Sequence, residues 1–557
     1  SPSPGAAGFV SGAELIERSV QHPEHPLVKG PAFAEAAANG PNPVRAAPGD
    51  WVAYRGDAGH RGFSRAAVAR EAAIAWRSEP LAAFSYSTLY NKFVSAFDER
   101  PAPPVCVGER VFSAGSDGIV MACSLATGKE LWRFCAGGPV MCSPAWSEGM
   151  LFVPGADGWV YALDAASGRL AWKRRLAPFE RRILMFDQLV STWPVLSLVV
   201  DGETVYAAAG HNATEGVKTF ALDARTGEVV WSHLDEPAED RFQSFPQPPD
   251  RPVQGIGGSM CLVGDRVWAA GYYSPPLTLE KANGKDHLAE LKDKYITSRR
   301  TCVGMRMYLY QRGRDVVRID DTMVLAGGGD LFENHHIRGK EEPRNRVIYR
   351  LYYCNEDGDW QLEPAPRKVL LSRIAPACDG ELLVCAGPPT YEERRGEIRS
   401  AGNARWATLG LSVWSMADFR EAAEAMQKSP FVVKDENNRV VGLKADFDFF
   451  NYDGAGWQKP DLDVNAVALT KNAVLVAHAT GREFNEHLIK LTEAEARQAL
   501  TRYDGWRISA FSRDGKETLW EVDLPAEPLF NGLAVAADGP IIVTLRDAST
   551  ACVRQKQ

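Results

Sequence analysis

The chain has 557 residues, of which 45% are hydrophobic and 24% are charged, and its formal net charge is −8. These values are ordinary for a globular protein. The acidic balance argues against a general nucleic-acid binder, which usually carries a basic domain. No stretch approaches the roughly 20 consecutive apolar residues of a membrane span. The length exceeds the ~250–300 residues of one simple core, so we expect several domains or one closed repeat architecture.

The chain begins SPSPGAAGFV, without an initiator methionine and without an apolar signal core, so an export signal cannot be read from it. The predicted location is periplasmic or extracellular. The ten cysteines include no CxxC pair, which argues against zinc-ribbon sites and covalent haem attachment. Cys378 and Cys385 bracket a predicted hairpin, and either a disulfide across it or two buried thiols fits that pattern.

The chain then shows an internal repeat. Residues 1–72 are predicted to form an extension that packs on the repeats, and residues 73–79 form a strand without a sequence neighbour to pair with. Four similar segments follow, at residues 122–132, 161–172, 220–231 and 509–520. The first three share the form apolar-x-[Asp/Ser]-x-x-[Thr/Ser]-Gly-x-x-x-Trp, and the fourth keeps the Gly and the Trp. Such self-similarity is typical of repeat architectures.

Each segment follows a hairpin of alternating apolar residues around a Gly, Asp or Asn turn, which predicts strands. One unit thus supplies four strands: two inner strands, a third, a Gly turn and an outer strand ending in Trp. The Gly permits the positive φ of a tight turn. The Trp is large enough to fill the gap between adjacent sheets while its N–H donates to a carbonyl. Trp132 and Trp172 lie 40 residues apart, the length of one propeller blade.

Fainter copies at residues 257–273, 316–329, 374–387 and 530–545 complete the series. We predict an all-β propeller of four-stranded antiparallel blades. Eight blades are expected, with seven as the alternative because residues 275–320 are irregular. The C-terminal unit lacks its outer strand, which the strand around Trp76 would supply. That pairing would close the ring and remove exposed sheet edges.

The repeated Ala-x-Asp-x-x-Thr-Gly-x-x-x-Trp element resembles the signature of the PQQ-like, quinoprotein alcohol dehydrogenase-like β-propellers, over roughly residues 73–553. That family includes quinone-dependent dehydrogenases, a scaffold of outer-membrane protein assembly and many exported bacterial proteins. The resemblance implies, for the dehydrogenases, adjacent cysteines in a vicinal disulfide and a calcium site. The chain has no Cys-Cys pair. PQQ is therefore not expected, and the cofactor is left open with a divalent cation as one candidate.

The longest segments are the links between blades and the links between second and third strands, which a propeller places on one face. The longest insertions are expected at about 416–465 and 480–507. Loops of this length are usually functional or disordered, so we expect a binding face over the central channel. It is rich in Arg and aromatic residues, which match carboxylates and sugar rings. The expected ligand is an anionic polysaccharide or another small molecule, not a nucleic acid.

We therefore expect an exported carbohydrate-binding or carbohydrate-cleaving propeller, with a lyase for uronate-containing polysaccharide as its catalytic form. β-Elimination needs an acid and a base together with groups that neutralise the carboxylate. The candidates are, as acids or bases, His211, His478, Tyr391 and Tyr452; as substrate-binding residues, Arg100, Arg182, Arg395 and Trp193; and, as metal ligands, His335 and His336. The alternatives are a non-catalytic binding or assembly scaffold with a protein partner, and a PQQ-dependent dehydrogenase.

Overall fold

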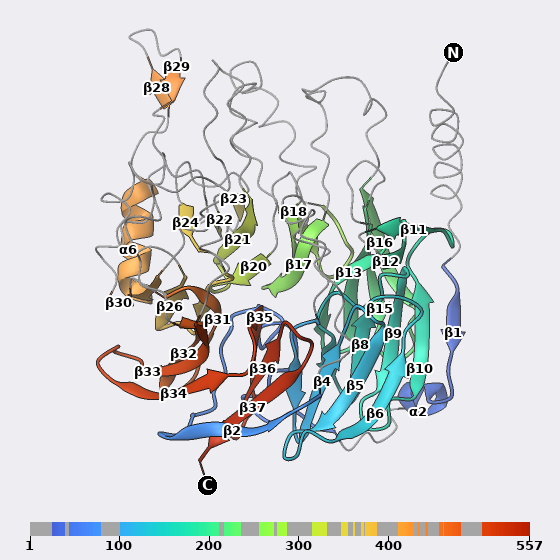
Figure 1. Ribbon diagram of the computed structural model, residues 1–557. Helices are drawn as coiled ribbons and strands as arrows, with labels where there is room; N and C mark the ends of the chain where they lie inside the picture. The colour runs from blue at the N-terminus through green and yellow to red at the C-terminus, as the bar shows by residue number, and fades with distance from the viewer. Residues whose placement is uncertain are drawn as a thin grey trace, which may run out of the picture.

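The computed structural model describes residues 25–38, 44–79, 101–185, 188–210, 217–235, 256–271, 276–286, 315–330, 347–354, 360–361, 369–372, 374–386, 410–427, 432–434, 440–443, 456–459, 462–480 and 504–556. These residues form eight small antiparallel sheets, the blades of a β-propeller (Figure 1). They include little helix, namely α2 (Phe33–Ala37) and α6 (Met416–Gln427). None of the described helices has the length and apolar run needed to cross a bilayer.

The first four blades follow one another in sequence. Blade 1 is β3 (Val105–Val107), β4 (Arg110–Ala114), β5 (Ile119–Ser124) and β6 (Glu130–Cys135). Blade 2 is β7 (Ala145–Ser147), β8 (Met150–Pro154), β9 (Trp159–Asp164) and β10 (Leu170–Arg175). Blade 3 is β13 (Val195–Asp201), β14 (Thr204–Ala209), β15 (Val217–Asp223) and β16 (Val229–Asp235). Blade 4 is β17 (Ile256–Val263), β18 (Arg266–Gly271) and β19 (Leu277–Glu280).

The other four blades complete the ring. Blade 5 is β20 (Asp315–Arg318), β21 (Met323–Asp330), β22 (Val347–Cys354) and β23 (Trp360–Gln361), with β24 (Val369–Leu371) also paired to β22. Blade 6 is β25 (Ala377–Cys378), β26 (Leu382–Cys385), β27 (Leu411–Ser415) and β30 (Trp457–Lys459). Blade 7 is β31 (Val464–Leu469), β32 (Ala473–Thr480), β33 (Gly505–Ser512) and β34 (Thr518–Leu524). Blade 8 is β35 (Pro528–Val535), β36 (Ile541–Leu545), β37 (Thr550–Gln555) and β2 (Ala72–Arg77).

The predicted closure of the ring is confirmed. Strand β2 pairs with β37 in the register Ile74↔Val553, so the two ends of the chain share blade 8 (Figure 1). The innermost strands of neighbouring blades contact each other from β35 back to β3. Three elements lie outside the blade pattern: β1 (Leu27–Lys29), which pairs with β10, and the hairpins β11 (Arg182–Met185) with β12 (Gln188–Ser191) and β28 (Val432–Lys434) with β29 (Val440–Leu443).

The recurrent tryptophans seal the seams between blades, as the sequence predicts. Five indole N–H groups donate to a carbonyl in the turn of the next blade; the pairs are Trp76–Leu125, Trp132–Ala165, Trp172–Ala224, Trp231–Lys281 and Trp457–Arg513, at 2.8–3.1 Å. The Trp520 indole donates instead to the carbonyl of Ala69, which precedes blade 8 in the chain, at 2.8 Å. The repeat glycine lies under the ring. A Cβ on Gly168 would come within 2.5 Å of the Trp132 indole, and its φ is +70°. Glycine is thus required twice over, by backbone conformation and by contact.

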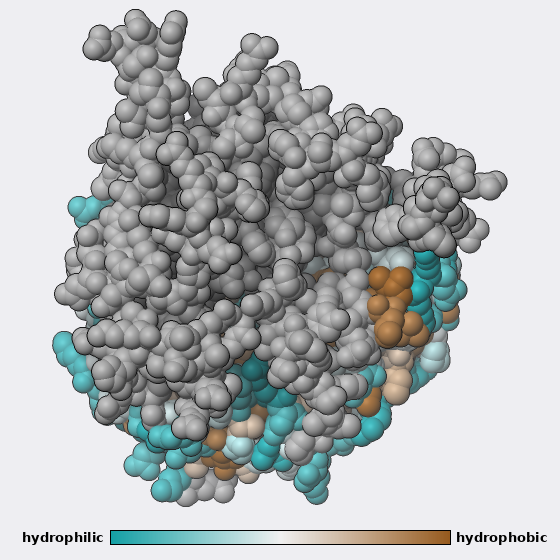
Figure 2. Space-filling view, turned by 45° about the horizontal axis from the view of Figure 1, so that its top comes forward, coloured by the Kyte–Doolittle hydropathy of each residue, from teal (hydrophilic) through white to brown (hydrophobic). Residues whose placement is uncertain are grey.

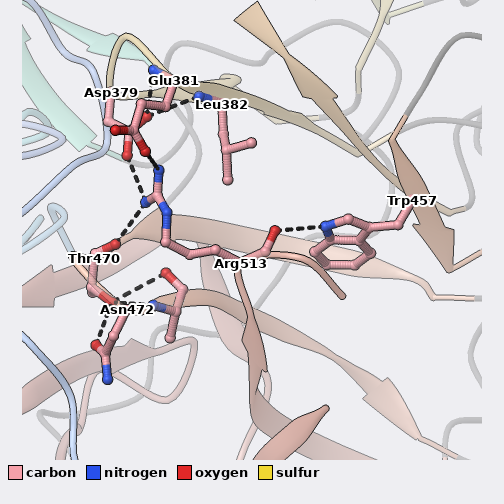
Figure 3. Close-up of polar contacts among 8 residues, drawn as sticks. Asp379, Glu381, Leu382, Trp457, Thr470, Asn472 and Arg513 are labelled. Atoms are coloured by element: carbon pink, nitrogen blue, oxygen red, sulfur yellow. Dashed lines mark hydrogen bonds and ion pairs between the residues drawn. The ribbon is translucent and has the colours of Figure 1, made fainter. Parts of the chain in front are cut away.

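One seam carries an additional ion pair (Figure 3). The Arg513 carbonyl accepts from the Trp457 indole at 2.9 Å, while the guanidinium reaches back to blade 6. There it pairs with Asp379 at 2.6 Å and with Glu381 at 3.0 Å, and it also donates to the carbonyl of Thr470 at 2.9 Å. Asp379 is almost fully buried. A single arginine thus ties blade 6 to blade 7, through its backbone carbonyl and through its guanidinium.

Two details differ from the sequence-based expectations. The run from Met416 was expected to link two blades, but β30 pairs with β27, so residues 416–456 join the third and fourth strands of blade 6. The sequence pattern did not reveal β30 as the outer strand of blade 6, because β30 follows a long insertion. Residues 481–503, most of the second expected insertion, lie outside the described residues. Cys378 and Cys385 are free buried thiols, because their strand partners are Leu383 and Ser412 and not each other.

Candidate functional site

Residues 50–69, which we call the N-terminal strap, run across one mouth of the central channel. Hydrogen bonds join the strap to blades 1, 2, 4, 5, 6, 7 and 8. Each bond reaches the end of an innermost strand, near the turn to the second strand; the blade residues are Cys106, Trp146, Leu262, Arg318, Cys378, Leu469 and Ala537. The strap therefore closes the channel on the face that carries these first turns.

The strap can follow this path because its sequence, YRGDAGHRGFS from Tyr54, is rich in glycine. Gly56 and Gly62 have φ values of +98° and +66°, and a Cβ on Gly62 would lie 2.5 Å from the Arg55 guanidinium. Asp57 holds the turn between them, because its carboxylate accepts from the Gly59 N–H at 2.9 Å and from Arg61 Nε at 2.7 Å. An Asp that bonds nearby backbone stabilises such turns.

A buried polar network joins the strap to the innermost strands of blades 5 and 8. The Tyr54 hydroxyl donates to Asp315 Oδ1 at 2.8 Å, and the Tyr349 hydroxyl donates to Asp315 Oδ2 at 3.1 Å. Asn531 in β35 donates from Nδ2 to the Tyr54 oxygen at 3.0 Å. Both oxygens of the Asp315 carboxylate thus have a donor, as a buried charge requires.

Arg55 is the centre of this network and is only 1% exposed. Its Nε donates to the His60 carbonyl at 3.2 Å, Nη1 to Asn531 Oδ1 at 3.2 Å, and Nη2 to the Pro376 carbonyl at 2.5 Å. These acceptors are neutral, and no ion pair between Arg55 and a carboxylate is found in the described part of the chain. A buried guanidinium held this way acts as a rigid brace between the strap and blades 6 and 8.

The residues around Arg55 occupy an uncommon backbone region. Arg55, His60 and Asn531 have φ values of 56°, 57° and 56° although none is glycine. Residues other than glycine rarely adopt positive φ, and each costs of order 1–3 kcal/mol unless the surroundings fix it. Here the hydrogen bonds of the network supply that fixation. Strain of this kind gathers at sites with a special role.

Asn465 and Asn531 occupy similar positions in blades 7 and 8. Each lies at a register shift of the innermost strand, four residues before the last pair of its hairpin; those pairs are Leu469↔Val474 and Val535↔Ile541. Asp315 in blade 5 instead pairs directly with Gly327. Asn465 is fully buried and donates to the Pro528 carbonyl at 2.8 Å, so it too bonds within the chain.

Burial keeps His60 and Cys142 in their neutral forms. It lowers the pKa of His60 to about 4, against the opposing charge of Asp315. Burial, together with the negative charge of Asp315, raises the pKa of the Cys142 thiol to about 12. The region thus offers a neutral imidazole and a neutral thiol, and not a reactive thiolate.

Residues 65–319 match the family model described as outer membrane protein assembly factor BamB, of the PQQ_2 type. The repeats in this part of the chain are thus of the PQQ-like type. The chain is also 28% identical over 154 residues to a polyvinylalcohol dehydrogenase of Sphingopyxis sp. (strain 113P3), a match that covers 24% of this chain and 22% of that protein. The matched region is thus about a fifth of the length of that relative.

Solved structures similar to this chain include an alcohol dehydrogenase and a BamB protein. A quinohemoprotein alcohol dehydrogenase from Comamonas testosteroni is 14% identical, with a TM-score of 0.46 over 94% of this chain and 85% of that one. BamB from Moraxella catarrhalis is 11% identical, with a TM-score of 0.31 over 80% of this chain and 82% of that one.

The described residues of the channel do not supply the groups that the resemblance implies for a quinone with its cation. The sequence has no adjacent cysteines. Asp315 accepts from two tyrosines and Asn531 Oδ1 accepts from Arg55 and from the Ala375 N–H, so among these oxygens only the buried Asn465 Oδ1 has no donor. Across the described ranges, no group of three or more His, Cys, Asp or Glu side chains is placed to hold a metal.

Three of the residues predicted as site residues lie in described parts of the PQQ-like propeller. His478 is buried in blade 7, with Nδ1 2.8 Å from the Ala479 carbonyl and Nε2 2.8 Å from the Ser509 hydroxyl; burial lowers its pKa. Trp193 is 1% exposed and packs in the core between blades 2 and 3. Arg182 is exposed on β11. The remaining candidates lie outside the described residues; they are His211, Tyr391, Tyr452, Arg100, Arg395, His335 and His336.

Sequence reasoning missed Tyr54, Arg55, Asp315 and Asn531. The two members of the Tyr54–Asp315 hydrogen bond are 261 residues apart, and those of the Arg55–Asn531 bond are 476 apart. No local pattern joins residues so distant. The available signal was the glycine-rich run YRGDAGHRGFS, which is too irregular for a strand or helix and too rich in Tyr, Arg and His for a plain linker.

Proposed function

We propose that the chain is an exported, non-catalytic binding propeller, a scaffold that presents the face opposite the strap to a partner. The observation that carries this proposal is the strap itself. It closes one mouth of the channel, and its network uses the buried polar groups of blades 5, 6 and 8 for bonds within the chain. An enzyme of this fold would need such groups to converge on a substrate.

The strand order indicates which face is available. The strap covers the turns between first and second strands, so the connections between second and third strands, and those between blades, leave from the other face. The family match over residues 65–319 supports a scaffold role by its description as an assembly factor. The match to a dehydrogenase covers 24% of the chain, and the described channel lacks the fit for its cofactor.

Elimination of a uronate polysaccharide gains no support from the described residues. A base must reach the C5 proton within hydrogen-bond distance. His478 is 5% exposed, and both of its ring nitrogens already have partners. Trp193 is too deeply buried to stack on a sugar ring. Arg182 is exposed, but a cation alone binds without catalysing.

Two activity assays and one binding assay test the proposal on the full chain. The first follows dye reduction with added pyrroloquinoline quinone, calcium and a panel of alcohols that includes polyvinyl alcohol. The second follows ultraviolet absorbance of unsaturated uronate during incubation with polyuronates. A scaffold gives no turnover in either. Alcohol-dependent dye reduction that requires the quinone, or a rise in absorbance, would refute it.

The binding assay uses a photoreactive amino acid at one of two exposed positions, in the chain expressed in its native host. Position 117 is exposed in the turn between the second and third strands of blade 1, on the available face, and position 131 lies on the outer strand β6. Leu131 is 48% exposed, so cross-linking there reports random encounters. A scaffold yields a discrete adduct at position 117 and none at position 131. Equal or absent adducts at both positions contradict a dedicated binding face.

A further inference from the structure

The hairpin β11–β12 exposes an apolar surface that the propeller fold does not require. Leu184 and Leu189 are cross-strand partners in this two-stranded sheet and are 74% and 52% exposed. On the opposite side of the ribbon, Ile183 pairs with Val190, which is fully buried against the body of the protein. Because side chains alternate along a strand, the hairpin has one packed face and one apolar face turned to solvent.

Figure 2 shows a compact hydrophobic patch on the side of the molecule where Figure 1 places β11 and β12. Most exposed apolar side chains in a protein occur singly and carry no meaning. Here two leucines lie directly opposite each other on a projecting ribbon. Such a cluster is typical of a surface that binds a membrane or another molecule.

Two cations lie at the base of the same hairpin. Arg181 and Arg182 are both exposed. Neither is within ion-pair distance of a carboxylate in the described ranges, although the charge of Arg182 acts on the buried Asp157. Arg182 stands two residues before Leu184, hence on the same side of the ribbon. The hairpin thus carries apolar side chains beyond its base and positive charge at its base. This order matches the order of acyl chains and phosphate groups in an anionic lipid leaflet.

We propose that the β11–β12 hairpin docks the protein on an anionic membrane surface, with Leu184 and Leu189 in the acyl boundary and Arg181 and Arg182 at the lipid phosphates. The small area of the exposed apolar patch favours lipid over a protein partner. Two leucines are far smaller than the roughly 1,000 Å² that a specific protein interface needs, whereas reversible membrane binding requires only a few apolar and basic groups. The chain carries a net charge of −8, so the attraction comes from this local pair of arginines.

Co-sedimentation of the full chain with vesicles tests this docking. Vesicles of phosphatidylcholine with phosphatidylglycerol are compared with vesicles of phosphatidylcholine alone. We expect binding to the anionic vesicles that weakens with salt. Leu184→Glu lowers the partition coefficient at least about tenfold, because it puts a charge where an apolar side chain enters the leaflet. Each of Arg181→Gln and Arg182→Gln lowers it about fivefold, the effect of roughly one basic residue near the surface.

Matched variants separate docking from misfolding. Leu131→Glu changes an exposed leucine on the outer strand of blade 1, and Arg65→Gln changes an exposed arginine on the strap. Both should bind vesicles as the unchanged protein does, and all variants should share one thermal midpoint. The proposal fails if the unchanged protein does not bind anionic vesicles, or if Leu184→Glu and Leu131→Glu bind them equally. It also fails if a photoreactive amino acid at position 182 cross-links to a protein in the native host. None of these outcomes depends on whether the propeller has catalytic activity.

Discussion

The Tyr54 hydroxyl and the Asp315 carboxylate form a 2.8 Å hydrogen bond between the strap and blade 5. Tyr349 donates to the second oxygen of the same carboxylate. The strap is therefore part of the folded ring and not an appendage. Substitutions in the strap should therefore alter the stability of the whole propeller. Substitutions at the repeat glycines should alter that stability through the contacts between neighbouring blades.

Arg55→Met should destabilise the protein by about 2–4 kcal/mol. The substitution removes the guanidinium from the buried carbonyls of His60 and Pro376, and it leaves Asn531 Oδ1 with only the Ala375 N–H, at 3.3 Å. Arg65→Met, at an exposed strap position, should cost less than about 0.5 kcal/mol. Urea unfolding followed by tryptophan fluorescence measures both. Equal midpoints for the two variants would show that the brace is not a structural element.

Gly168→Ala should destabilise by about 2–4 kcal/mol, because the new Cβ meets the Trp132 indole at 2.5 Å and the backbone keeps a positive φ. Gly202→Ala is the matched control. Gly202 also has a positive φ, of +55°, but its Cβ would have no neighbour within 4 Å. It should lose only the backbone cost, about 1 kcal/mol. A loss of stability in Gly202→Ala as large as that in Gly168→Ala would show that contact with the indole ring does not matter at this seam.

Acid should weaken the fold partly through His60. Burial lowers the pKa of this group to about 4 in the folded protein, below its unfolded value near 6.5. A lowered pKa means that the unfolded chain binds the proton more readily. The stability from neutral His60 is therefore complete above about pH 6.5 and falls as the pH drops towards 4, by at most about 3 kcal/mol.

His60→Asn tests this contribution, since asparagine tolerates the positive φ of 57° better than most residues. The difference in unfolding free energy between the variant and the unchanged protein should shrink as the pH falls from 6.5 to 4. His25, whose pKa burial also lowers to about 4, is present in both proteins and cancels. A difference that stays constant over this window would show that His60 is not neutral by burial.

Thiol chemistry should distinguish the buried cysteines from the exposed one. Cys135 is exposed, whereas Cys378 is buried and its pKa is raised to about 12 by burial. In titration with Ellman's reagent, Cys135→Ser should remove one fast-reacting thiol and Cys378→Ser none until the protein unfolds. Reducing agent should not shift the thermal midpoint. A midpoint lowered by reductant would indicate a disulfide.

The fold was predictable because its signals are local. The Gly-x-x-x-Trp spacing predicted the blades, and Trp76 without a partner predicted the closing strand. Blade 6 shows the limit of this reasoning, since its outer strand at Trp457 follows an insertion and lacks the Gly turn in its usual place. The network of Arg55 was beyond reach, because contacts across 476 residues leave no periodic trace. The site candidates on the long links rested on residue type alone.

Hydrogen exchange of the strap tests the central claim most directly. Strap amides such as those of Trp51 and Ser64 donate to blade carbonyls at 2.9 Å. Strap carbonyls in turn accept hydrogen bonds from seven backbone amides of the blades. If the strap closes the channel, peptides covering residues 51–64 should exchange as slowly as those of the inner strands β31 and β32. Exchange of these peptides as fast as in an unfolded chain would contradict the closed channel and, with it, the scaffold role.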